Sequence, residues 1–218
     1  MGRGCFVTGT GTEVGKTVVA AVIARSFAGA GGRVAVFKPV ESGLSEDGEP
    51  DHVLLRRACG SAQTDDEIAP YQFGPPVSPH LAAELAGERI EPPALVRAAS
   101  AAAAGADYLV CEGVGGLLVP LTLGYLVRDL ARELDLPLVI AASPGLGTIN
   151  HILLTIEAAR AVGLEVAFVV LTPWPERPSA VEPSNRTAIE RLGSVRTELL
   201  PALDLETPES WPTLRPPE

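Results

Sequence analysis

Five short runs of apolar residues divide the chain, and each run has the length of a β-strand. Within each run the apolar positions are nearly continuous and do not alternate with polar ones. Strands of this kind are buried on both faces, as in a parallel sheet that has helices on each side. The predicted strands cover residues 5–8, 33–38, 107–112, 137–142 and 165–171.

The stretches between these runs predict helices. Residues 17–28 are apolar almost all round, which predicts a buried helix, whereas residues 126–134 have one charged side. The other predicted helices cover residues 93–104, 148–162 and 184–192. This alternation indicates an α/β fold in a single domain, with a mostly parallel β-sheet flanked by helices on both faces. We expect residues 1–218 to form that one domain, with the proline-rich residues 201–218 as an irregular tail.

The composition narrows the range of functions. The 218 residues are 46% hydrophobic, and the formal net charge is −10. Because there is no basic run and no basic surplus, we do not expect binding to nucleic acid. The N-terminal residues enter the first apolar run too soon for a signal peptide, and no apolar run approaches the roughly 18 residues of a membrane span. We therefore expect a cytoplasmic protein without a membrane partner.

The cysteines and histidines do not predict a metal site. The three cysteines lack paired spacing, and Cys5 and Cys111 lie in apolar runs, so we expect buried thiols there. The three histidines also show no ligand spacing, and we expect each to be a surface residue or a hydrogen-bonded one. They are His52, His80 and His151.

A glycine-rich loop follows the first predicted strand. Residues 4–17 have the sequence GCFVTGTGTEVGKT, so Lys16 and Thr17 begin the first predicted helix. Glycines let backbone N–H groups approach phosphate oxygens closely, and the helix N-terminus adds donors and partial positive charge. Lys16 supplies a full charge, and the Thr17 hydroxyl can bind Mg²⁺. We interpret this loop as a phosphate-binding loop, which makes the fold P-loop NTPase-like.

The spacing within the loop differs from the common pattern. Five residues separate Gly9 from Gly15, where the usual pattern has four, and three residues separate Gly11 from Gly15. The alternative is a glycine-rich turn that binds nothing. Lysine and threonine at the start of a helix, directly after an apolar strand, favour the phosphate site.

Charged residues end the second and third predicted strands. Lys38 ends residues 33–38, and Glu112 ends residues 107–112 just before the glycines of GVGG. Ligands of a parallel sheet bind beyond the carboxyl ends of its strands, so we expect both groups beside the phosphate loop. Lys38 would be a second cation facing the phosphates, and Glu112 a ligand of Mg²⁺, directly or through water. The alternatives are a lysine that leaves the core for solvent and an ordinary exposed glutamate.

Three further patterns are compatible with a ligand site. Ser42 lies in a turn of small residues that could touch a substrate. Residues 46–51 hold four acids, of which Asp51, at the start of an expected helix, is the best metal ligand. The alternative is a solvated acidic loop. Residues 145–150 form a glycine-rich turn before a helix, which could bind an anion or could simply be a turn with a threonine cap.

Several motifs together resemble those of the dethiobiotin synthetase family. They are FVTGTGTEVGKT, FKPVESG, VSPHLAAE, CEGVGGLLVPL and GLGTINHILLTIEAA, in the order and spacing of that family. The family has the same five-residue spacing in its phosphate loop. Each motif alone is weak, but the set is specific and extends from the N-terminus to about residue 171.

The resemblance implies an ATP-dependent and Mg²⁺-dependent ligase that closes the ureido ring of dethiobiotin in biotin synthesis. Its substrates would be 7,8-diaminononanoate, CO₂ and ATP. One amine captures CO₂ as a carbamate, which attacks the γ-phosphate and gives a carbamic–phosphoric anhydride. The second amine then closes the ring and expels phosphate. Such an enzyme acts mainly by positioning and charge neutralisation.

The resemblance also implies a role for each matching residue. The nucleotide-binding residues would be Gly9, Thr10, Gly11, Thr12, Glu13, Val14, Gly15, Lys16, Thr17 and Glu112. The catalytic residues would be Thr12, Lys16 and Lys38, and the metal ligands Thr17, Asp51 and Glu112. The substrate-binding residues would be Lys38, Ser42, Gly147, Thr148 and Asn150. The family is a homodimer, and the turn that holds the last three residues would bind the substrate carboxylate in the site of the partner subunit.

One segment departs from the family pattern. After the strand that ends at Leu171 the family typically has an asparagine that recognises adenine, whereas residues 172–175 of this chain are TPWP. Asn185 is near in sequence but falls at the start of a predicted helix. The sequence therefore does not predict how the base is recognised.

Three other classes of protein fit the sequence less well. A partitioning-type ATPase of the same broad fold, working as a nucleotide-switched binding protein, has an additional lysine early in its phosphate loop, and residues 9–14 have none. An amidotransferase-linked cobyrinate-type synthetase needs a glutaminase domain, for which 218 residues leave no room. A nucleotide kinase needs an arginine-rich lid that the sequence lacks.

Overall fold

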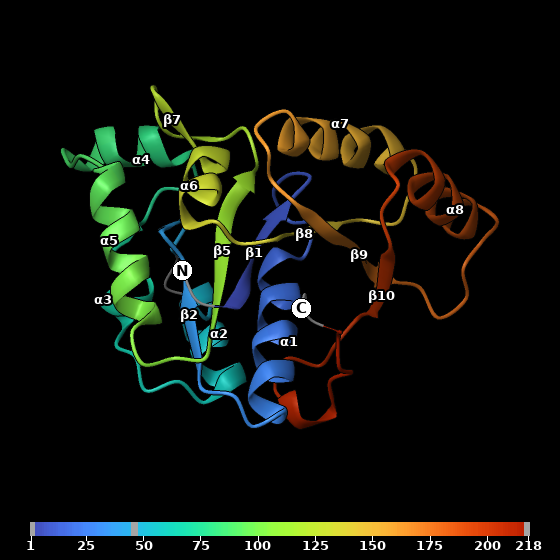
Figure 1. Ribbon diagram of the computed structural model, residues 1–218, viewed down its shortest axis with the longest axis horizontal. Coiled ribbons are helices and arrows are strands. Elements are labelled where there is room, and N and C mark those ends of the chain that lie inside the picture. The colour runs from blue at the N-terminus through green and yellow to red at the C-terminus, as the bar shows by residue number, and fades with distance from the viewer. Residues whose placement is uncertain (1–2, 45–47, 216–218) are drawn as a thin grey trace.

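A six-stranded sheet runs through the molecule, and helices cover both of its faces (Figure 1). The computed structural model describes residues 3–44 and 48–215. The strand order is β10-β9-β8-β1-β5-β2, and every neighbouring pair is parallel. The strands are β1 (Arg3–Gly9), β2 (Val34–Phe37), β5 (Tyr108–Gly116), β8 (Leu138–Ala142), β9 (Val166–Trp174) and β10 (Thr197–Pro201). The predicted fold class is therefore confirmed.

Helices pack on the sheet in two layers. The helices are α1 (Lys16–Gly29), α2 (Asp51–Cys59), α3 (Asp65–Ile68), α4 (Pro79–Ala86), α5 (Pro92–Ala103), α6 (Val127–Leu134), α7 (Thr148–Arg160) and α8 (Val181–Gly193). Along β1, Cys5 and Val7 belong to the core under α1 and α2, whereas Phe6 belongs to the core under α5 and α6. Both faces of the strands are buried, which explains why their sequences are continuously apolar.

Short elements complete the described chain. Strand β3 (Val40–Ser42) pairs in parallel with β4 (Tyr71–Phe73), and β6 (Pro120–Thr122) pairs with β7 (Tyr125–Leu126) as an antiparallel ribbon. A single 3₁₀ turn covers Pro208–Ser210. None of the described helices combines the length and the apolar character needed to cross a membrane.

Every strand and helix whose bounds were predicted is present. Each of the five predicted strands overlaps an observed strand, and the five predicted helices correspond to α1, α5, α6, α7 and α8 with ends that differ by three residues or fewer. Strand β10, helices α3 and α4 and the short strands β3, β4, β6 and β7 were not predicted. β10 is an edge strand whose apolar run is only Leu199 and Leu200, which is too short to suggest a strand.

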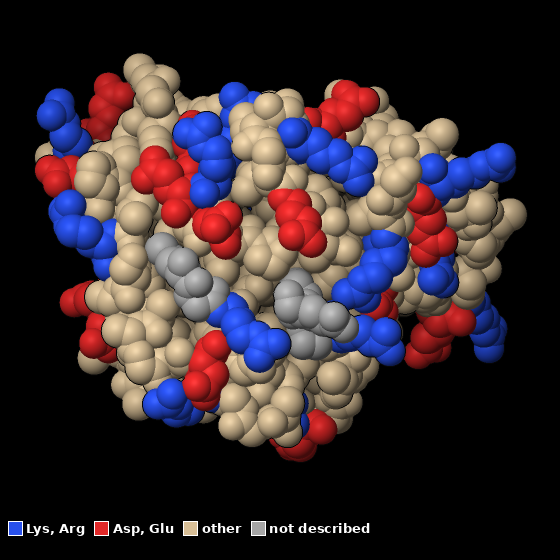
Figure 2. Space-filling view, viewed as in Figure 1, with Lys and Arg blue, Asp and Glu red and all other residues tan. Residues whose placement is uncertain are grey.

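The C-terminal tail packs on the core. Trp211 is 7% exposed and Leu214 3% exposed, and both belong to the core beneath α1. The backbone N–H of Leu214 donates a hydrogen bond of 3.2 Å to Ser26 Oγ, in α1, and Trp211 Nε1 donates one of 2.7 Å to Asp204 O. The tail therefore covers part of α1. On the face that Figure 2 shows, acidic and basic side chains are interspersed, so neither sign of charge dominates that face.

Candidate active site at the carboxyl ends of the strands

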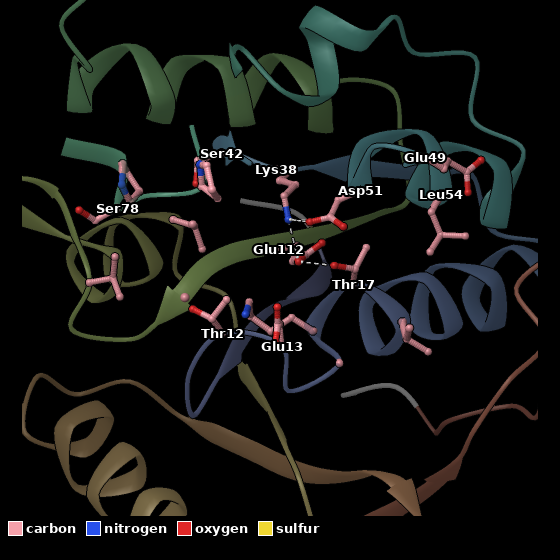
Figure 3. Close-up of a pocket in the computed structure, with 18 of the residues that line it drawn as sticks. Thr12, Glu13, Thr17, Lys38, Ser42, Glu49, Asp51, Leu54, Ser78 and Glu112 are labelled. Carbon is pink, nitrogen blue, oxygen red and sulfur yellow. Dashed lines mark hydrogen bonds and ion pairs between the residues drawn. The ribbon is translucent and has the colours of Figure 1, made fainter. Parts of the chain in front are cut away.

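A cavity of about 830 Å³ lies at the carboxyl ends of β1, β2 and β5 (Figure 3). Nine of the residues expected at the site line this cavity. They are Thr12, Glu13, Gly15, Lys16, Thr17, Lys38, Ser42, Asp51 and Glu112. They come from segments that are far apart in the sequence, and the parallel sheet gathers them because its strands end at the same edge.

The loop between β1 and α1 encloses the amino end of α1. Gly15 has a left-handed backbone with φ of 82°, and a Cβ at this position would lie 2.8 Å from Cγ2 of Thr172, so only glycine fits without strain. Helix α1 begins at Lys16 without a side-chain cap, which leaves its first N–H groups available to an anion. Lys16 Nζ donates a hydrogen bond of 2.9 Å to Gly11 O and thus lies over the loop.

Lys38 lies at the centre of a charged cluster in the cavity. Its Nζ is 2.8 Å from Glu112 Oε1 and 2.5 Å from Asp51 Oδ2. The hydroxyl of Thr17 donates a hydrogen bond of 2.9 Å to the same Oε1 of Glu112. Figure 3 shows the four side chains converging from β5, α1, α2 and the end of β2. Lys38 therefore does not leave the core for solvent, and Glu112 is not an exposed turn residue, since they are 3% and 0% exposed.

Burial and neighbouring charges shift the pKa values in this cluster. Burial raises the pKa of Glu112, and Lys38 offsets only part of that rise. Burial alone would lower the pKa of Lys38, but the Glu112 and Asp51 carboxylates outweigh it and hold that pKa above its ordinary value. Burial likewise would raise the pKa of Asp51, but Lys38 brings it below its ordinary value. Burial lowers the pKa of Lys16. Lys38 is thus a fixed positive charge at neutral pH.

The oxygen atoms around Thr17 fit a magnesium ion. Glu112 Oε2 is buried and has no hydrogen-bond partner, and the Thr17 hydroxyl and the Asp51 carboxylate lie close by. Magnesium at phosphate sites usually takes one or two carboxylates together with phosphate oxygens. Within residues 3–44 and 48–215 no group of three or more His, Cys, Asp or Glu could hold a metal, so the phosphates of a nucleotide would have to complete the coordination.

The far wall of the cavity is the loop before α4. Ser42 Oγ donates a hydrogen bond of 2.9 Å to the backbone oxygen of Val77, so the serine faces the cavity and also ties β3 to this loop. No role was predicted for the wall residues Pro76, Val77, Ser78 and Pro79. The motif VSPHLAAE, which begins at Val77, was the available signal.

Other wall residues had no signal in the sequence. Leu205 and Glu206, from the tail, line the cavity, and Arg57 Nη1 lies 3.6 Å from Glu206 Oε2. Arg57 Nη2 also forms an ion pair of 2.8 Å with Glu49, another lining residue, from the acidic segment. Of the four acids in that segment, Glu46 and Asp47 lie outside the described residues.

Some expected site residues lie elsewhere. Gly9, Thr10 and Gly11 line a second cavity of about 410 Å³, together with residues of α7 and of the stretch after β5. Val14 packs on the core under α1. Gly147, with φ of 91°, Thr148 and Asn150 form the amino end of α7 and do not line the larger cavity. Within this chain the structure therefore does not bring this turn to Lys38.

The segment that departs from the family pattern continues β9 as far as Trp174. Asn185 lies in α8, as expected, and is 7% exposed. Its Nδ2 donates hydrogen bonds of 2.9 Å to both Pro144 O and Gly145 O. The amide therefore fixes the turn between β8 and α7, and its donors are already used.

Both lysines of the chain lie in the larger cavity. Lys16 and Lys38 are the only lysines among 17 basic residues, and all other cations are arginines. Lysine offers a compact point charge with three rotatable donors, whereas arginine offers a planar fork. The two basic residues that line the cavity are thus compact point charges, a type of cation that commonly binds phosphate oxygens.

The chain is similar to known proteins along most of its length. Residues 3–208 match a protein-family model described as an AAA domain. Over 193 residues the chain is 40% identical to the ATP-dependent dethiobiotin synthetase BioD of Bacillus thuringiensis (strain Al Hakam), covering 88% of this chain and 80% of the relative. Over 191 residues it is 44% identical to the protein of the same name from Anaeromyxobacter dehalogenans (strain 2CP-1 / ATCC BAA-258), covering 87% and 85%.

Solved structures share the fold. A ParA family ATPase from Chlorobium tepidum TLS has a TM-score of 0.58 at 13% identity, covering 94% of this chain and 88% of that one. The septum site-determining protein MinD from Pyrococcus horikoshii OT3, complexed with Mg-ADP, has a TM-score of 0.57 at 13% identity, covering 92% and 82%. At this identity the likeness shows the common architecture alone.

Proposed function

This chain belongs to the family of ATP-dependent dethiobiotin synthetases, and we propose that it closes the ureido ring of dethiobiotin from 7,8-diaminononanoate and CO₂. The family consists of ATP-dependent ligases, so ATP is the co-substrate. The identity of the two carbon substrates, the need for Mg²⁺ and the order of the steps are the content of the proposal.

The contact of Lys38 with Glu112 and Asp51 is the observation that best supports it. A buried amine that is protonated at neutral pH lies in the same cavity as the phosphate loop and Ser42. A carbamate that attacks a γ-phosphate brings two anions together. The reaction therefore needs a positive charge at that point, held in place before the substrates bind.

The proposed reaction has three steps. One amine of the diamine attacks CO₂, which forms an N–C bond and, after loss of a proton, a carbamate. A carbamate oxygen attacks the γ-phosphorus, the bond from that phosphorus to the β-phosphate oxygen breaks, and ADP leaves. The second amine attacks the activated carbonyl carbon, the C–O bond to phosphate breaks, and inorganic phosphate and a proton leave with the ring closed.

Residues of the chain would position and neutralise these groups. The N–H groups of the phosphate loop and Lys16 would bind the phosphates. Lys38 would neutralise the carbamate and the γ-phosphate. Thr12 and Glu13 line the cavity opposite Ser42, which supports roles beside the phosphates and the diamine. The enzyme would thus act mainly by proximity and charge.

Thr17, Asp51 and Glu112 would hold Mg²⁺, and the unpartnered, buried Oε2 of Glu112 supports this assignment. The ion, when bound, supplies positive charge to the β- and γ-phosphate oxygens. The carboxylates of Asp51 and Glu112 also form the ion pairs with Lys38, so the same two groups would bind both Lys38 and Mg²⁺.

We also propose a homodimer in which the turn from Gly147 to Asn150 binds the substrate carboxylate in the partner's site. Exposed leucines beside this turn support a second copy as the neighbour, since Leu118, Leu146 and Leu154 are 53%, 97% and 56% exposed. The uncapped amino end of α7 offers N–H donors to a carboxylate.

Phosphate release with MgATP and bicarbonate, measured with and without the diamine, tests the proposal. We expect release only when the diamine is present, with one dethiobiotin formed for each phosphate, as measured by mass spectrometry. Release that does not depend on the diamine would instead favour a nucleotide-switched partitioning-type ATPase. That alternative is weakened by the lack of a lysine in residues 9–14.

A further inference from the structure

A buried carboxylate and a buried imidazole lie next to Asp51 without lining the cavity. Glu41, in β3, is 4% exposed, and His52, the second residue of α2, is 3% exposed. Glu41 Oε2 lies 2.6 Å from His52 Nδ1, and Glu41 Oε1 accepts a hydrogen bond of 2.6 Å from the backbone N–H of Asp51. An ionised carboxylate can only accept, so His52 donates through Nδ1.

The bond to the Asp51 backbone replaces the missing cap of α2. Pro50 occupies the N-cap position, and the helix has no side-chain cap of its own. Glu41 supplies both an acceptor and a negative charge at the helix N-terminus from a neighbouring strand. Because Asp51 is the first residue of α2, fixing its N–H fixes the backbone from which its carboxylate extends toward Lys38.

His52 in turn fixes the direction of Glu41. Nδ1 of His52 holds the second oxygen of Glu41, and Nε2 lies 3.7 Å from Oδ1 of Asp65, which also pairs with Arg56. A buried carboxylate is costly unless hydrogen bonds satisfy it, and here each oxygen of Glu41 has one donor. The Glu41 carboxylate is therefore a fully hydrogen-bonded support for the start of α2.

We propose that Glu41 and His52 are positioning residues that hold the Asp51 carboxylate where it meets Lys38 and Mg²⁺. The inference rests on the proposed function, which assigns Asp51 to the metal. Without Glu41 the first turn of α2 loses its anchor, and the carboxylate spends less time at the metal. Loss of a group that orients a metal ligand typically lowers metal affinity about 10- to 100-fold. The defect lies in metal binding and not in the reaction at saturating metal.

Mn²⁺ binding to the full-length protein, with the non-hydrolysable analogue AMP-PNP present and free Mn²⁺ measured by electron paramagnetic resonance, tests this role. We expect Glu41→Leu to weaken Mn²⁺ binding about 10-fold. Glu41→Gln keeps an oxygen for the Asp51 N–H and an amide that can donate to the other tautomer of His52, so its Mn²⁺ affinity should stay within about 1.5-fold of that of the wild type. The exposed Glu88→Leu is the control for loss of one charge.

Turnover measurements should also show a defect in metal binding and little change in the reaction at saturating metal. In Glu41→Leu the half-saturating Mg²⁺ concentration should rise about 10-fold, while kcat at saturating Mg²⁺ changes by less than about threefold. A general loss of structure would lower kcat and the unfolding temperature together. If Glu41→Leu does not fold, His52→Leu provides the test, because it keeps the bond to the Asp51 N–H and frees only the second oxygen. We expect it to weaken Mn²⁺ binding about threefold.

Asp51→Asn separates this inference from the proposed function. If Asp51→Asn weakens Mn²⁺ binding but Glu41→Leu, or His52→Leu in its place, binds as the wild type does, the positioning role is wrong and the metal assignment stands. If Asp51→Asn binds Mn²⁺ as the wild type does, the metal assignment itself fails. Equal losses in Glu41→Gln and Glu41→Leu would also overturn the positioning role, because the hydrogen bonds would then not matter.

Discussion

Lys38 and Glu112 form an ion pair of 2.8 Å between Nζ and Oε1 although 74 residues separate them in the chain. The pairing of strands explains the contact. Phe37, the last residue of β2, is in register with Cys111 of β5, so the residues that follow them, Lys38 and Glu112, lie side by side. Their side chains are 4% and 0% exposed, so water screens this pair little.

Replacing Lys38 with methionine should both destabilise the protein and stop product formation. The substitution keeps the apolar stem but leaves the buried Glu112 carboxylate without its cation. Removing one partner of a buried pair costs about 3–5 kcal/mol, so the free energy of unfolding in urea should fall by about 3 kcal/mol. Product formation should fall at least about 100-fold. A variant as stable as the wild type would contradict the role of the pair.

The pH dependence of that loss follows from the raised pKa of Lys38. A lysine whose pKa is raised on folding stabilises the protein fully below its unfolded pKa of about 10.4, and the contribution is lost as the pH rises past that value. The stability difference between Lys38→Met and the wild type should therefore be nearly constant from about pH 6 to 9 and shrink above about 10.4.

Replacing Lys16 with alanine should abolish product formation and leave the fold intact. In the folded chain Nζ of Lys16 makes one hydrogen bond, to Gly11 O, so its loss should cost no more than about 1 kcal/mol. The phosphates lose a full charge, so product formation should fall at least about 100-fold. Circular dichroism and urea unfolding measure the first effect, and phosphate release with the diamine measures the second. Unchanged turnover would remove the phosphate-loop assignment.

The sheet and the gathering of charged groups could be predicted because both depend on local patterns. Continuous apolar strands indicate a parallel sheet, and residues that follow its strands share one edge. That reasoning is enough to bring Lys38 and Glu112 to the phosphate loop. It is not enough to show that Thr17 donates to Glu112, 95 residues away, because side-chain contacts depend on packing.

The contacts that could not be predicted join segments that are far apart in the sequence and have no clear apolar periodicity. Val77, in the wall of the cavity, accepts a hydrogen bond from Ser42, which lies 35 residues earlier in the sequence. The loop that holds Val77 has no apolar periodicity that would predict this contact. No role was predicted for Glu41, which lies between the apolar run that ends at Lys38 and the turn at Ser42, and His52 was expected only to be a surface or hydrogen-bonded residue. Their burial is evident only once β3 lies beside the start of α2, since neither residue type predicts burial by itself.

Two glycine substitutions should have opposite effects. Gly15→Ala forces a left-handed backbone on alanine and brings its Cβ against Thr172, so stability should fall by roughly 1–2 kcal/mol. Nucleotide binding should weaken too, because the phosphate loop must shift. A Cβ added at Gly29, the last residue of α1, would meet no atom within 4 Å, so Gly29→Ala should be neutral or stabilise by up to about 1 kcal/mol. Urea unfolding compares them, and an equal loss in both would contradict the argument.

The cysteines should resist thiol reagents while the protein is folded. Burial raises the pKa of Cys5 from 9.0 to about 12, and burial raises that of Cys111 as well. At pH 8 about one thiol in ten thousand would be ionised at a pKa of 12, against about one in ten at 9. We expect Ellman's reagent to reach at most Cys59, which is partly exposed, until guanidinium makes all three reactive. Rapid reaction of two or more thiols in the native protein would contradict this burial.

The raised pKa of Cys5 should also make the folded protein less stable at alkaline pH. The Cys5 thiol ionises near pH 9 in the unfolded chain but only near pH 12 in the folded one. The folded state thus holds its proton more tightly, and the free energy of unfolding should fall as the pH rises above about 9. Cys5→Ala should lose part of this dependence, which urea unfolding between about pH 7 and 10 would measure.

Replacing Glu112 with glutamine should raise the Mg²⁺ requirement sharply. The amide keeps the size of the side chain and an oxygen for the Thr17 hydroxyl, but it removes the negative charge and the free, buried Oε2. The half-saturating Mg²⁺ concentration for phosphate release should therefore rise at least about 10-fold. Glu49→Gln is the matched control, because Glu49 lines the same cavity but pairs with Arg57. An unaltered Mg²⁺ titration in Glu112→Gln would exclude the metal role, and equal shifts in both variants would mean that the cavity attracts the ion by its overall charge and not through a ligand.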